Sequence, residues 1–334
     1  MNHTMELEKQ KLSKLSTYIN NGSINFLVGS GLSVPFIPIL PVNFEKDLQD
    51  AEESGNQEQS IKLKKSIFTK VLKPNLSLLE NIETANETLE NYKKFVSTLH
   101  SIITERIHNL LHRQINIFTT NYDLLFECAL ESCGIEYNCG FSGHFFPTYN
   151  SDNFKKTVLK RGMFLDSSSE IPSFNIVKLH GSISWAQRED RITLKYPSEI
   201  IQYFQDIDPE ADDFQTKYNS FTIINPSNKK FLDTVLLDIY SDLLRLYSSE
   251  LEKQNSLLFV CGFSFNDLHI QRLTLKAANA NPTLKIFILA YEDSDVFLKL
   301  QKDAINNNIE IINKKFDIEH IILLFQEIRG PHDK

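Results

Sequence analysis

Cysteine is rare in this sequence, and the few cysteines are not spaced as a zinc site requires. The chain of 334 residues contains four, at Cys128, Cys133, Cys139 and Cys261. No two of them form a C-x-x-C pair, the spacing typical of structural zinc sites. We therefore expect free thiols that are mostly buried, and we expect no metal centre.

Glycine and proline are also scarce, with 11 residues each, whereas phenylalanine is abundant, with 24. Disordered and repeat-rich chains have the opposite balance, so both classes are excluded. Hydrophobic residues make up 41% of the chain, which is enough to bury a sizeable core.

Two further absences bear on location and partners. No apolar run approaches the roughly 20 residues that span a bilayer, and the N-terminal segment lacks the apolar region of a signal peptide. The formal net charge of −8 is opposite in sign to that of a generally basic nucleic-acid binder. We expect a cytoplasmic protein with no membrane partner and no direct, sequence-specific contact with nucleic acid.

Short apolar strands alternate with helical patterns along the chain, which is typical of a parallel sheet covered on both faces. We predict a single α/β domain over residues 1–334, with a Rossmann-like parallel sheet flanked by helices. Residues 43–111 are rich in Leu, Glu, Lys and Asn, and we interpret them as a helical insertion that Pro74 divides. Residues 138–220 are irregular and turn-prone, and we interpret them as a cap-like insertion.

Four of the predicted strands end in polar or glycine-rich residues. These clusters are Gly29–Ser33, Thr119–Asp123, His180–Ser182 and Gly262–Asp267. In open α/β sheets, ligands bind beyond the carboxyl ends of the strands. If the four strands are parallel, the clusters therefore converge on one edge of the sheet.

Taken singly, each cluster has a structural interpretation as well as a functional one. Gly29 and Gly31 allow a close approach to a diphosphate, but position 34 is Val where a dinucleotide fingerprint has its third glycine. Asn121 or Asp123 is compatible with capping of the helix that follows. A lone histidine such as His180 is more often a packing residue than a catalyst.

In their combination and order, these clusters resemble the sirtuin superfamily, and they look closest to bacterial sirtuin-like proteins that hydrolyse NAD in antiphage defence. The matching residues run from about residue 24 to residue 290. They are Gly29-Ser-Gly-Leu-Ser33, Thr120-Asn-Tyr-Asp123, Lys178-Leu-His-Gly-Ser182 with Trp185, Asn225-Pro226, and Gly262-Phe-Ser-Phe-Asn-Asp267.

The resemblance implies an NAD site and a role for each matching residue. The diphosphate is expected at Gly29, Ser30, Gly31 and Ser33, the adenosine ribose and phosphate at Gly262 and Ser264, and the nicotinamide carboxamide near Asp123. Asn121 is expected to contact the nicotinamide ribose and position a water, and His180 is expected to act as a base. The resemblance leaves the role of Asp267 open between helix capping and the site.

Departures from the family pattern favour hydrolysis of NAD over deacylation. Deacylase sirtuins carry a zinc module with two C-x-x-C pairs, and here the cap-like insertion stands in its place. The segment that clamps an acyl-lysine peptide is replaced by "FTIINPSNKK". We therefore expect an NAD hydrolase that takes NAD as its substrate and needs no metal, and we expect it to act in antiphage defence.

The resemblance also implies control of the activity, because unregulated hydrolysis of NAD would poison the host. We expect a homo-oligomer with a separate regulatory partner such as a HerA-type ATPase. The alternatives are an NAD-dependent protein deacylase or ADP-ribosyl transferase, and a non-catalytic NAD-sensing assembly subunit.

Overall fold

The computed structural model describes residues 13–41, 44–80, 87–106, 111–163, 167–223, 234–313 and 315–329. Its centre is a seven-stranded sheet with the strand order β13-β12-β11-β1-β2-β8-β3, in which every pair of neighbours is parallel. The strands are β1 Ser23–Val28, β2 Gln114–Thr119, β3 Glu136–Asn138, β8 Ser173–Lys178, β11 Ser256–Cys261, β12 Lys285–Ala290 and β13 Ile309–Asn313.

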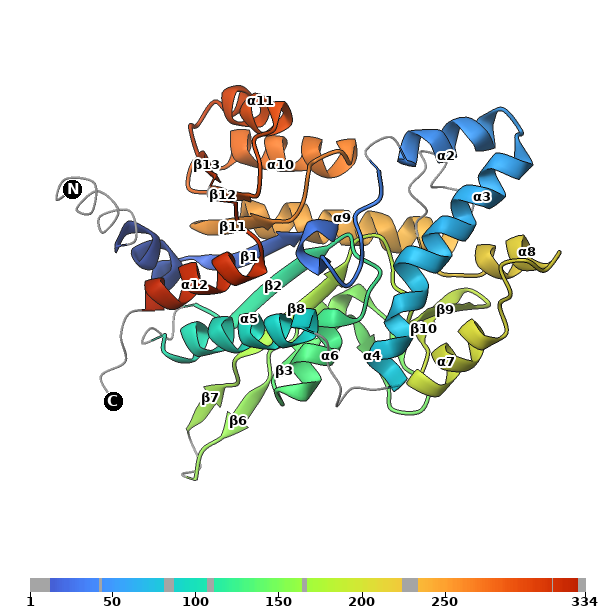
Figure 1. Cartoon of the computed structure of the whole chain (residues 1–334). Coiled ribbons are helices and arrows are strands. Elements are labelled where there is room, and N and C mark those ends of the chain that lie inside the picture. The colour runs from blue at the N-terminus through green and yellow to red at the C-terminus, as the bar shows by residue number, and fades with distance from the viewer. Residues whose placement is uncertain are drawn as a thin grey trace.

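Helices cover both faces of this sheet (Figure 1). Helices α5 Glu87–Thr104, α6 Leu125–Ser132 and α12 Ile318–Arg329 lie on one face, and α9 Thr234–Glu252, α10 Leu268–Ala280 and α11 Asp295–Asp303 lie on the other. The predicted fold class, a Rossmann-like parallel sheet flanked by helices, is confirmed. Helix α5 belongs to a covering layer although it lies within the predicted insertion 43–111.

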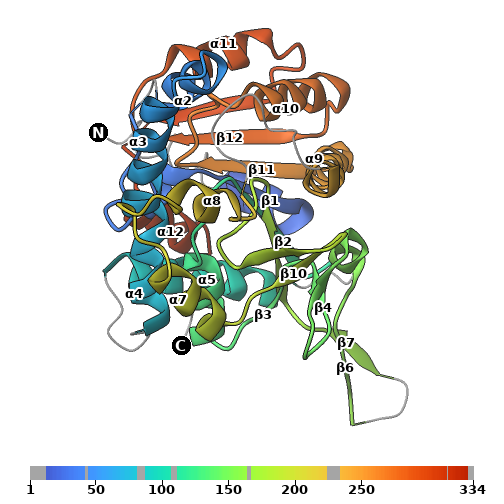
Figure 2. The same ribbon diagram turned by 90° about the vertical axis from the view of Figure 1, so that its right-hand side faces the viewer.

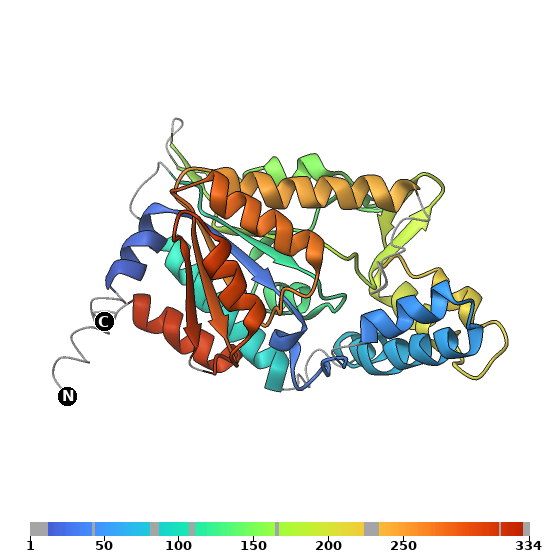
Figure 3. The ribbon, with the colours of Figure 1, turned by 90° about the horizontal axis from the view of Figure 1, so that it is seen from above.

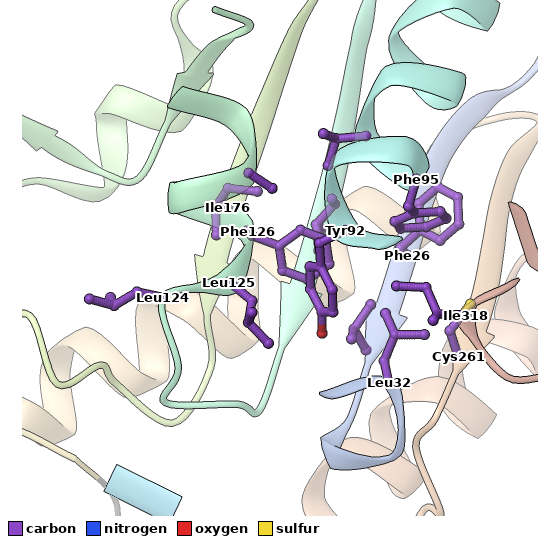
Figure 4. Close-up of a cluster of buried hydrophobic side chains, with 14 of the residues drawn as sticks. Phe26, Leu32, Tyr92, Phe95, Leu124, Leu125, Phe126, Ile176, Cys261 and Ile318 are labelled. Atoms are coloured by element: carbon purple, nitrogen blue, oxygen red, sulfur yellow. The ribbon is translucent and has the colours of Figure 1, made fainter. Parts of the chain in front are cut away.

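The side chains of the central strand β1 point alternately to the two faces of the sheet, and the apolar core is accordingly divided into two clusters. Phe26 of β1 packs against Phe95 of α5 and Phe325 of α12, whereas Leu27 joins the cluster on the other face. Figure 4 shows the first cluster, where Tyr92 and Phe126 also meet near Phe26. Burial on both faces explains why this strand reads as a continuous apolar run in the sequence.

Five further helices form a second group at one end of the molecule, toward which β1 and β2 point (Figure 3). This group comprises α2 Phe44–Glu53, α3 Gln57–Ile67, α4 Leu76–Glu80, α7 Pro197–Gln205 and α8 Phe214–Asn219, with short helical turns at Phe68–Leu72 and Lys73–Asn75. Phe68 packs against the rings of Phe204, Phe214 and Phe221. Pro74 lies in the turn between α3 and α4, so the predicted division there is confirmed.

The predicted cap-like insertion, residues 138–220, includes β8 of the central sheet, and its other strands form two small antiparallel sheets. One has the order β4-β5-β10-β9, with β4 Phe141–Ser142, β5 Thr148–Tyr149, β9 Trp185–Arg188 and β10 Arg191–Leu194. The other is the hairpin of β6 Leu159–Arg161 and β7 Ser168–Glu170, which projects from the body (Figure 2). A 3-10 helix, Ser151–Lys155, lies between β5 and β6.

At the boundary between the cap and α9, the described residues form an isolated antiparallel bridge between Ile223 and Gly181. Asn225 and Pro226 lie outside the described residues. No helix among the described residues is long and apolar enough to cross a membrane.

Candidate active site

The four polar clusters lie side by side at the carboxyl edge of the sheet. Their strands are consecutive in the order β11-β1-β2-β8 and end in register, since Val28 pairs with both Cys261 and Thr119, and Thr119 pairs with Lys178. All four clusters therefore begin at the same level. The predicted convergence on one edge is confirmed.

The glycine loop after β1 is locked against the turn after β11. The backbone N–H of Gly31 donates to the carbonyl of Gly262 at 2.9 Å. A Cβ on Gly29 would lie 2.5 Å from the Gly262 oxygen, and a Cβ on Gly262 would lie 2.4 Å from the nitrogen of Leu32. The glycines at these positions therefore let two backbone segments touch, which explains their presence before any ligand is considered.

Two serines from this pair of loops are exposed to solvent. Ser30 begins the short 3-10 helix Ser30–Ser33 after β1, and Ser264 follows the glycine turn after β11. Because the two loops touch, these hydroxyls belong to one surface. Among the predicted diphosphate and adenosine contacts, these two serines are exposed, Gly31 and Gly262 are half-buried, and Gly29 and Ser33 are buried.

Hydrogen bonds hold the side-chain amide of Asn121 in one orientation. Its Nδ2 group donates to the backbone oxygen of Gly29 at 3.1 Å and to the hydroxyl of Ser33 at 3.0 Å. Both amide hydrogens are thereby used, so Asn121 offers its carbonyl oxygen, Oδ1, as an acceptor for a hydroxyl or a water. The capping interpretation does not apply to Asn121, because Asp123 accepts from the N–H of Leu125 at the start of α6, at 3.2 Å.

The hydroxyl of Ser33 is the centre of a buried network. It donates to Oδ2 of Asp123 at 2.9 Å and accepts from Asn121, which leaves its second lone pair for the hydroxyl of Tyr92 at 3.0 Å. The side chains of Ser33, Asp123 and Tyr92 are 0–2% exposed. In this structure Ser33 and Asp123 therefore reach the site through Asn121, and their predicted contacts with NAD stay predictions.

A buried ion pair supports the loop that carries Asn121. Nζ of Lys178 lies 3.2 Å from Oε2 of Glu127 and donates to the backbone oxygen of Asp123. Burial raises the pKa of Glu127, and the charge of Lys178 acts against that rise. The pair ties β8 to α6 directly beneath Asn121.

His180 follows β8 and lies against Asp267. Its Nε2 is 3.0 Å from Oδ2 of Asp267, and its ring centre is 6.5 Å from that of Tyr240 on α9. Gly181, with φ of +79°, turns the chain away immediately after the histidine. The structure thus brings together the last two of the four clusters through a direct side-chain contact.

Sequence reasoning missed several residues that build this site. Tyr92 lies 59 positions from its partner Ser33, and no local pattern marks it. Glu127 reads as an ordinary helix residue. Lys178 was part of the quoted motif without a role, although a lysine within an apolar strand is itself a signal of a buried partner.

The cysteines do not assemble a metal site within the described residues, where no group of three or more candidate ligands occurs. Cys128 and Cys261 are buried, and Cys133 and Cys139 are partly buried. Burial raises the pKa of Cys128 to about 12 and that of Cys139 to about 11, so both thiols are neutral near pH 7. The prediction of free thiols is confirmed.

The fold and this edge define a Rossmann-like α/β protein whose candidate site lies at the topological switch around β1. A family model described as a SIR2-like domain matches residues 115–313, more than half of the chain. The chain therefore belongs to the SIR2-like family, and this membership indicates an NAD-dependent activity. The glycine loop lies before the matched residues.

Solved structures of Sir2 proteins are similar to this chain at low identity. One, described as showing the mechanism and regulation of Sir2 enzymes, is 13% identical, with 96% of this chain and 100% of that chain covered and a TM-score of 0.47. Sir2Tm bound to a propionylated peptide is 16% identical, with coverage of 96% and 99% and a TM-score of 0.48. A Sir2 mutant with a p53 peptide and NAD is 14% identical, with coverage of 96% and 98% and a TM-score of 0.46. No curated protein matches the chain.

Proposed function

We propose that this protein is an NAD hydrolase, which cleaves NAD to nicotinamide and ADP-ribose. The observation that carries the proposal is the pair Asn121 and His180, each placed at an in-register strand end and each held by a buried or partly buried partner. They lie in a chain that belongs to the SIR2-like family.

The residues at this edge fit NAD. Exposed Ser30 and Ser264, on touching loops, are suited to the diphosphate and the adenosine ribose. The Oδ1 atom of Asn121 is suited to accept from a hydroxyl of the nicotinamide ribose or from a water. These loops stand on β11, β1 and β2, three neighbouring strands, so an extended dinucleotide along the edge meets all of them.

The proposed reaction breaks the bond between the nicotinamide nitrogen and C1′ of the ribose. Nicotinamide leaves as a neutral molecule with the bonding electrons, and positive charge develops on the ribose. A water adds at C1′ and loses a proton, so NAD⁺ and water give nicotinamide, ADP-ribose and H⁺. Asn121 orients the ribose and the water, and His180 takes up the proton, since a neutral imidazole is an effective acceptor near pH 7.

Two departures of the sequence from the deacylase pattern support water, and not an acyl-lysine peptide, as the acceptor of the ADP-ribosyl group. The chain has no C-x-x-C pair for the zinc module of deacylases, and its peptide-clamping segment is replaced. The four-stranded sheet and the helices α7 and α8 lie within residues 138–220, which we interpret as standing in place of the zinc module.

We further propose that the hydrolase depletes cellular NAD in antiphage defence, in the cytoplasm, and is held inactive until triggered. The helical group formed by α2, α3, α7 and α8 lies at the end toward which the strands point, so its movement would change access to the site. Control by oligomerisation and by a separate partner, such as a HerA-type ATPase, is part of this proposal.

The test incubates the purified protein with NAD, alone and with the products of neighbouring genes, and separates the products by chromatography. We expect free nicotinamide and ADP-ribose in equal amounts, and we expect Asn121→Ala and His180→Ala to abolish turnover. Tyr196→Phe, an exposed cap residue, serves as the matched control and should retain activity. O-acyl-ADP-ribose or a labelled macromolecule would instead identify a transferase, and binding without consumption under every condition would identify a sensor.

A further inference from the structure

The acidic residue that ends the fourth cluster, Asp267, uses its two oxygens for two different tasks. Oδ1 accepts from the backbone N–H groups of His269, at 2.9 Å, and Ile270, at 3.2 Å, and so caps helix α10. Oδ2 lies 3.0 Å from Nε2 of His180. One carboxylate therefore joins the start of α10 to the ring at the end of β8.

We propose that Asp267 is a positioning residue that fixes His180 in the tautomer whose Nδ1 accepts the proton. This inference rests on the proposed hydrolysis of NAD, in which His180 is the base. An ionised carboxylate can only accept hydrogen bonds, so Nε2 of the ring carries the hydrogen and Nδ1 carries the lone pair. The same carboxylate stabilises the imidazolium that forms when Nδ1 takes up a proton.

The turn that delivers Asp267 is held in a strained conformation. Gly262 and Phe265 have φ values of +60° and +59°, and for phenylalanine this left-handed region is unfavourable. Phe265 is 1% exposed and packs against Phe263 and Phe297, with ring centres 5.1 and 6.2 Å away. Such strain persists where the surrounding packing imposes it. The packing here places the carboxylate beside His180.

A helix cap alone does not account for this arrangement. Asparagine and serine cap helices about as well as aspartate, and one side-chain oxygen suffices. The second oxygen of Asp267 faces the ring of His180, and the described residue Tyr240 of α9 also lies beside that ring. Burial, together with the charge of Asp267, raises the pKa of Tyr240, so this phenol stays neutral and Asp267 supplies the negative charge.

Asp267→Asn separates the two tasks. The amide oxygen of asparagine still accepts from α10, which turns the Nδ2 donor toward Nε2 of His180. The ring must then accept at Nε2, so Nδ1 carries the hydrogen and is no longer a base. We expect kcat for NAD hydrolysis to fall by about 100-fold or more with little change in KM, as for removal of the orienting acid from a catalytic triad.

The matched control is Ser294→Ala, which removes the N-cap of α11, where Ser294 Oγ accepts from Val296 N at 3.3 Å. It should lower stability without changing kcat. Asp267→Ser keeps a capping hydroxyl but withdraws the carboxylate, and it serves if the asparagine variant does not fold. Urea midpoints for all variants show which of them lose only stability.

Nuclear magnetic resonance of ¹⁵N-histidine-labelled protein reads the tautomer directly, with His180→Gln used for assignment. We expect a protonated Nε2 in the wild type and a protonated Nδ1 in Asp267→Asn, and we expect His180 to protonate at a lower pH in both Asp267 variants. The same tautomer and titration midpoint in wild type and variants would overturn the proposal, as would a changed tautomer with undiminished kcat. If the wild type hydrolyses no NAD, the resonance experiment still decides the Asp267–His180 pairing, and only the proposed function fails.

Discussion

The buried ion pair beneath the candidate site predicts a stability effect with a defined size and pH dependence. Lys178 is 2% exposed, lies 3.2 Å from the carboxylate of Glu127, and donates to the backbone oxygen of Asp123. Lys178→Met keeps most of the apolar stem and removes both contacts. Glu127, whose side chain is 15% exposed, then remains as a largely buried carboxylate without its counter-charge.

The magnitude follows from separating the two lost contacts. Removal of one partner from a buried ion pair costs about 3–5 kcal/mol, and the partial exposure of Glu127 favours the lower end, about 3 kcal/mol. Roughly 1 kcal/mol of this belongs to the Asp123 carbonyl that loses its donor. Adding Glu127→Gln removes the stranded charge, so the double variant should recover about 2 kcal/mol.

The sign of the pH dependence follows from the pKa of Glu127, which burial raises and Lys178 lowers. Its pKa in the folded state thus lies above the unfolded value of about 4.3. A group of this kind stabilises the folded state when it is protonated, and that stability is lost as the pH rises through the folded pKa. Lys178→Met removes the lowering influence. The deficit of this variant should therefore be largest at high pH, where Glu127 is ionised, and shrink toward about 1 kcal/mol as the pH falls through the pKa of Glu127.

Urea unfolding of the wild type, both single variants and the double variant, at several pH values, measures these differences. Far-ultraviolet circular dichroism follows the whole chain, and fluorescence follows Trp185, the single tryptophan, which is buried in the cap. The reasoning would be refuted by a Lys178→Met deficit below about 1 kcal/mol near pH 8. A deficit that Glu127→Gln leaves unchanged would refute it equally.

Two further predictions concern the loops at the carboxyl edge of the sheet. Ser33→Ala should lower the free energy of unfolding by about 3 kcal/mol in urea and lower kcat about 10- to 100-fold, because Asn121 loses one of its two hydrogen-bond acceptors. Tyr92→Phe should lower the free energy of unfolding by only about 1 kcal/mol. Equal effects of the two substitutions would contradict the hydrogen-bond network around Ser33. Gly29→Ala should prevent folding or lower the melting temperature sharply, because its Cβ would lie 2.5 Å from a backbone oxygen. The control Gly134→Asn should be tolerated, because φ is +62° there and the space around the residue is open. Equal melting temperatures for the two variants would count against the close contact at Gly29.

The sequence was sufficient to predict the main elements of the fold and the common level of the four clusters. Apolar runs such as Phe26–Val28 mark buried strands, and parallel neighbours place their carboxyl ends together. Glycine is also common just after the end of a helix, and Gly134 follows the C-cap of α6 with φ of +62°. Asn121 and His180 could be singled out because they follow such strands, whereas their proposed catalytic roles came from the resemblance to the sirtuin superfamily.

The hydrogen-bond partners that hold Asn121 and His180 in place could not be predicted, because they come from distant parts of the chain. Ser33 looked like a ligand-binding hydroxyl, yet the 3-10 turn directs it inward to Asp123, 90 positions away. Asp267 was read as a cap or a site residue, and the structure shows the cap together with a contact to His180, 87 positions away. Local patterns specify what a residue can do, and only the fold specifies which partner it meets.

The two catalytic candidates are held from opposite faces of the sheet. Asn121 is oriented by Ser33, which Tyr92 of α5 holds from one covering layer. His180 is oriented by Asp267 at the start of α10, in the other layer. The contacts described above join each support to a different layer of helices, so we expect a shift of α5 to misplace Asn121 and a shift of α10 to misplace His180. Under the proposed function, a regulator that contacts either layer of helices would therefore change the geometry at the carboxyl edge of the sheet without entering the site.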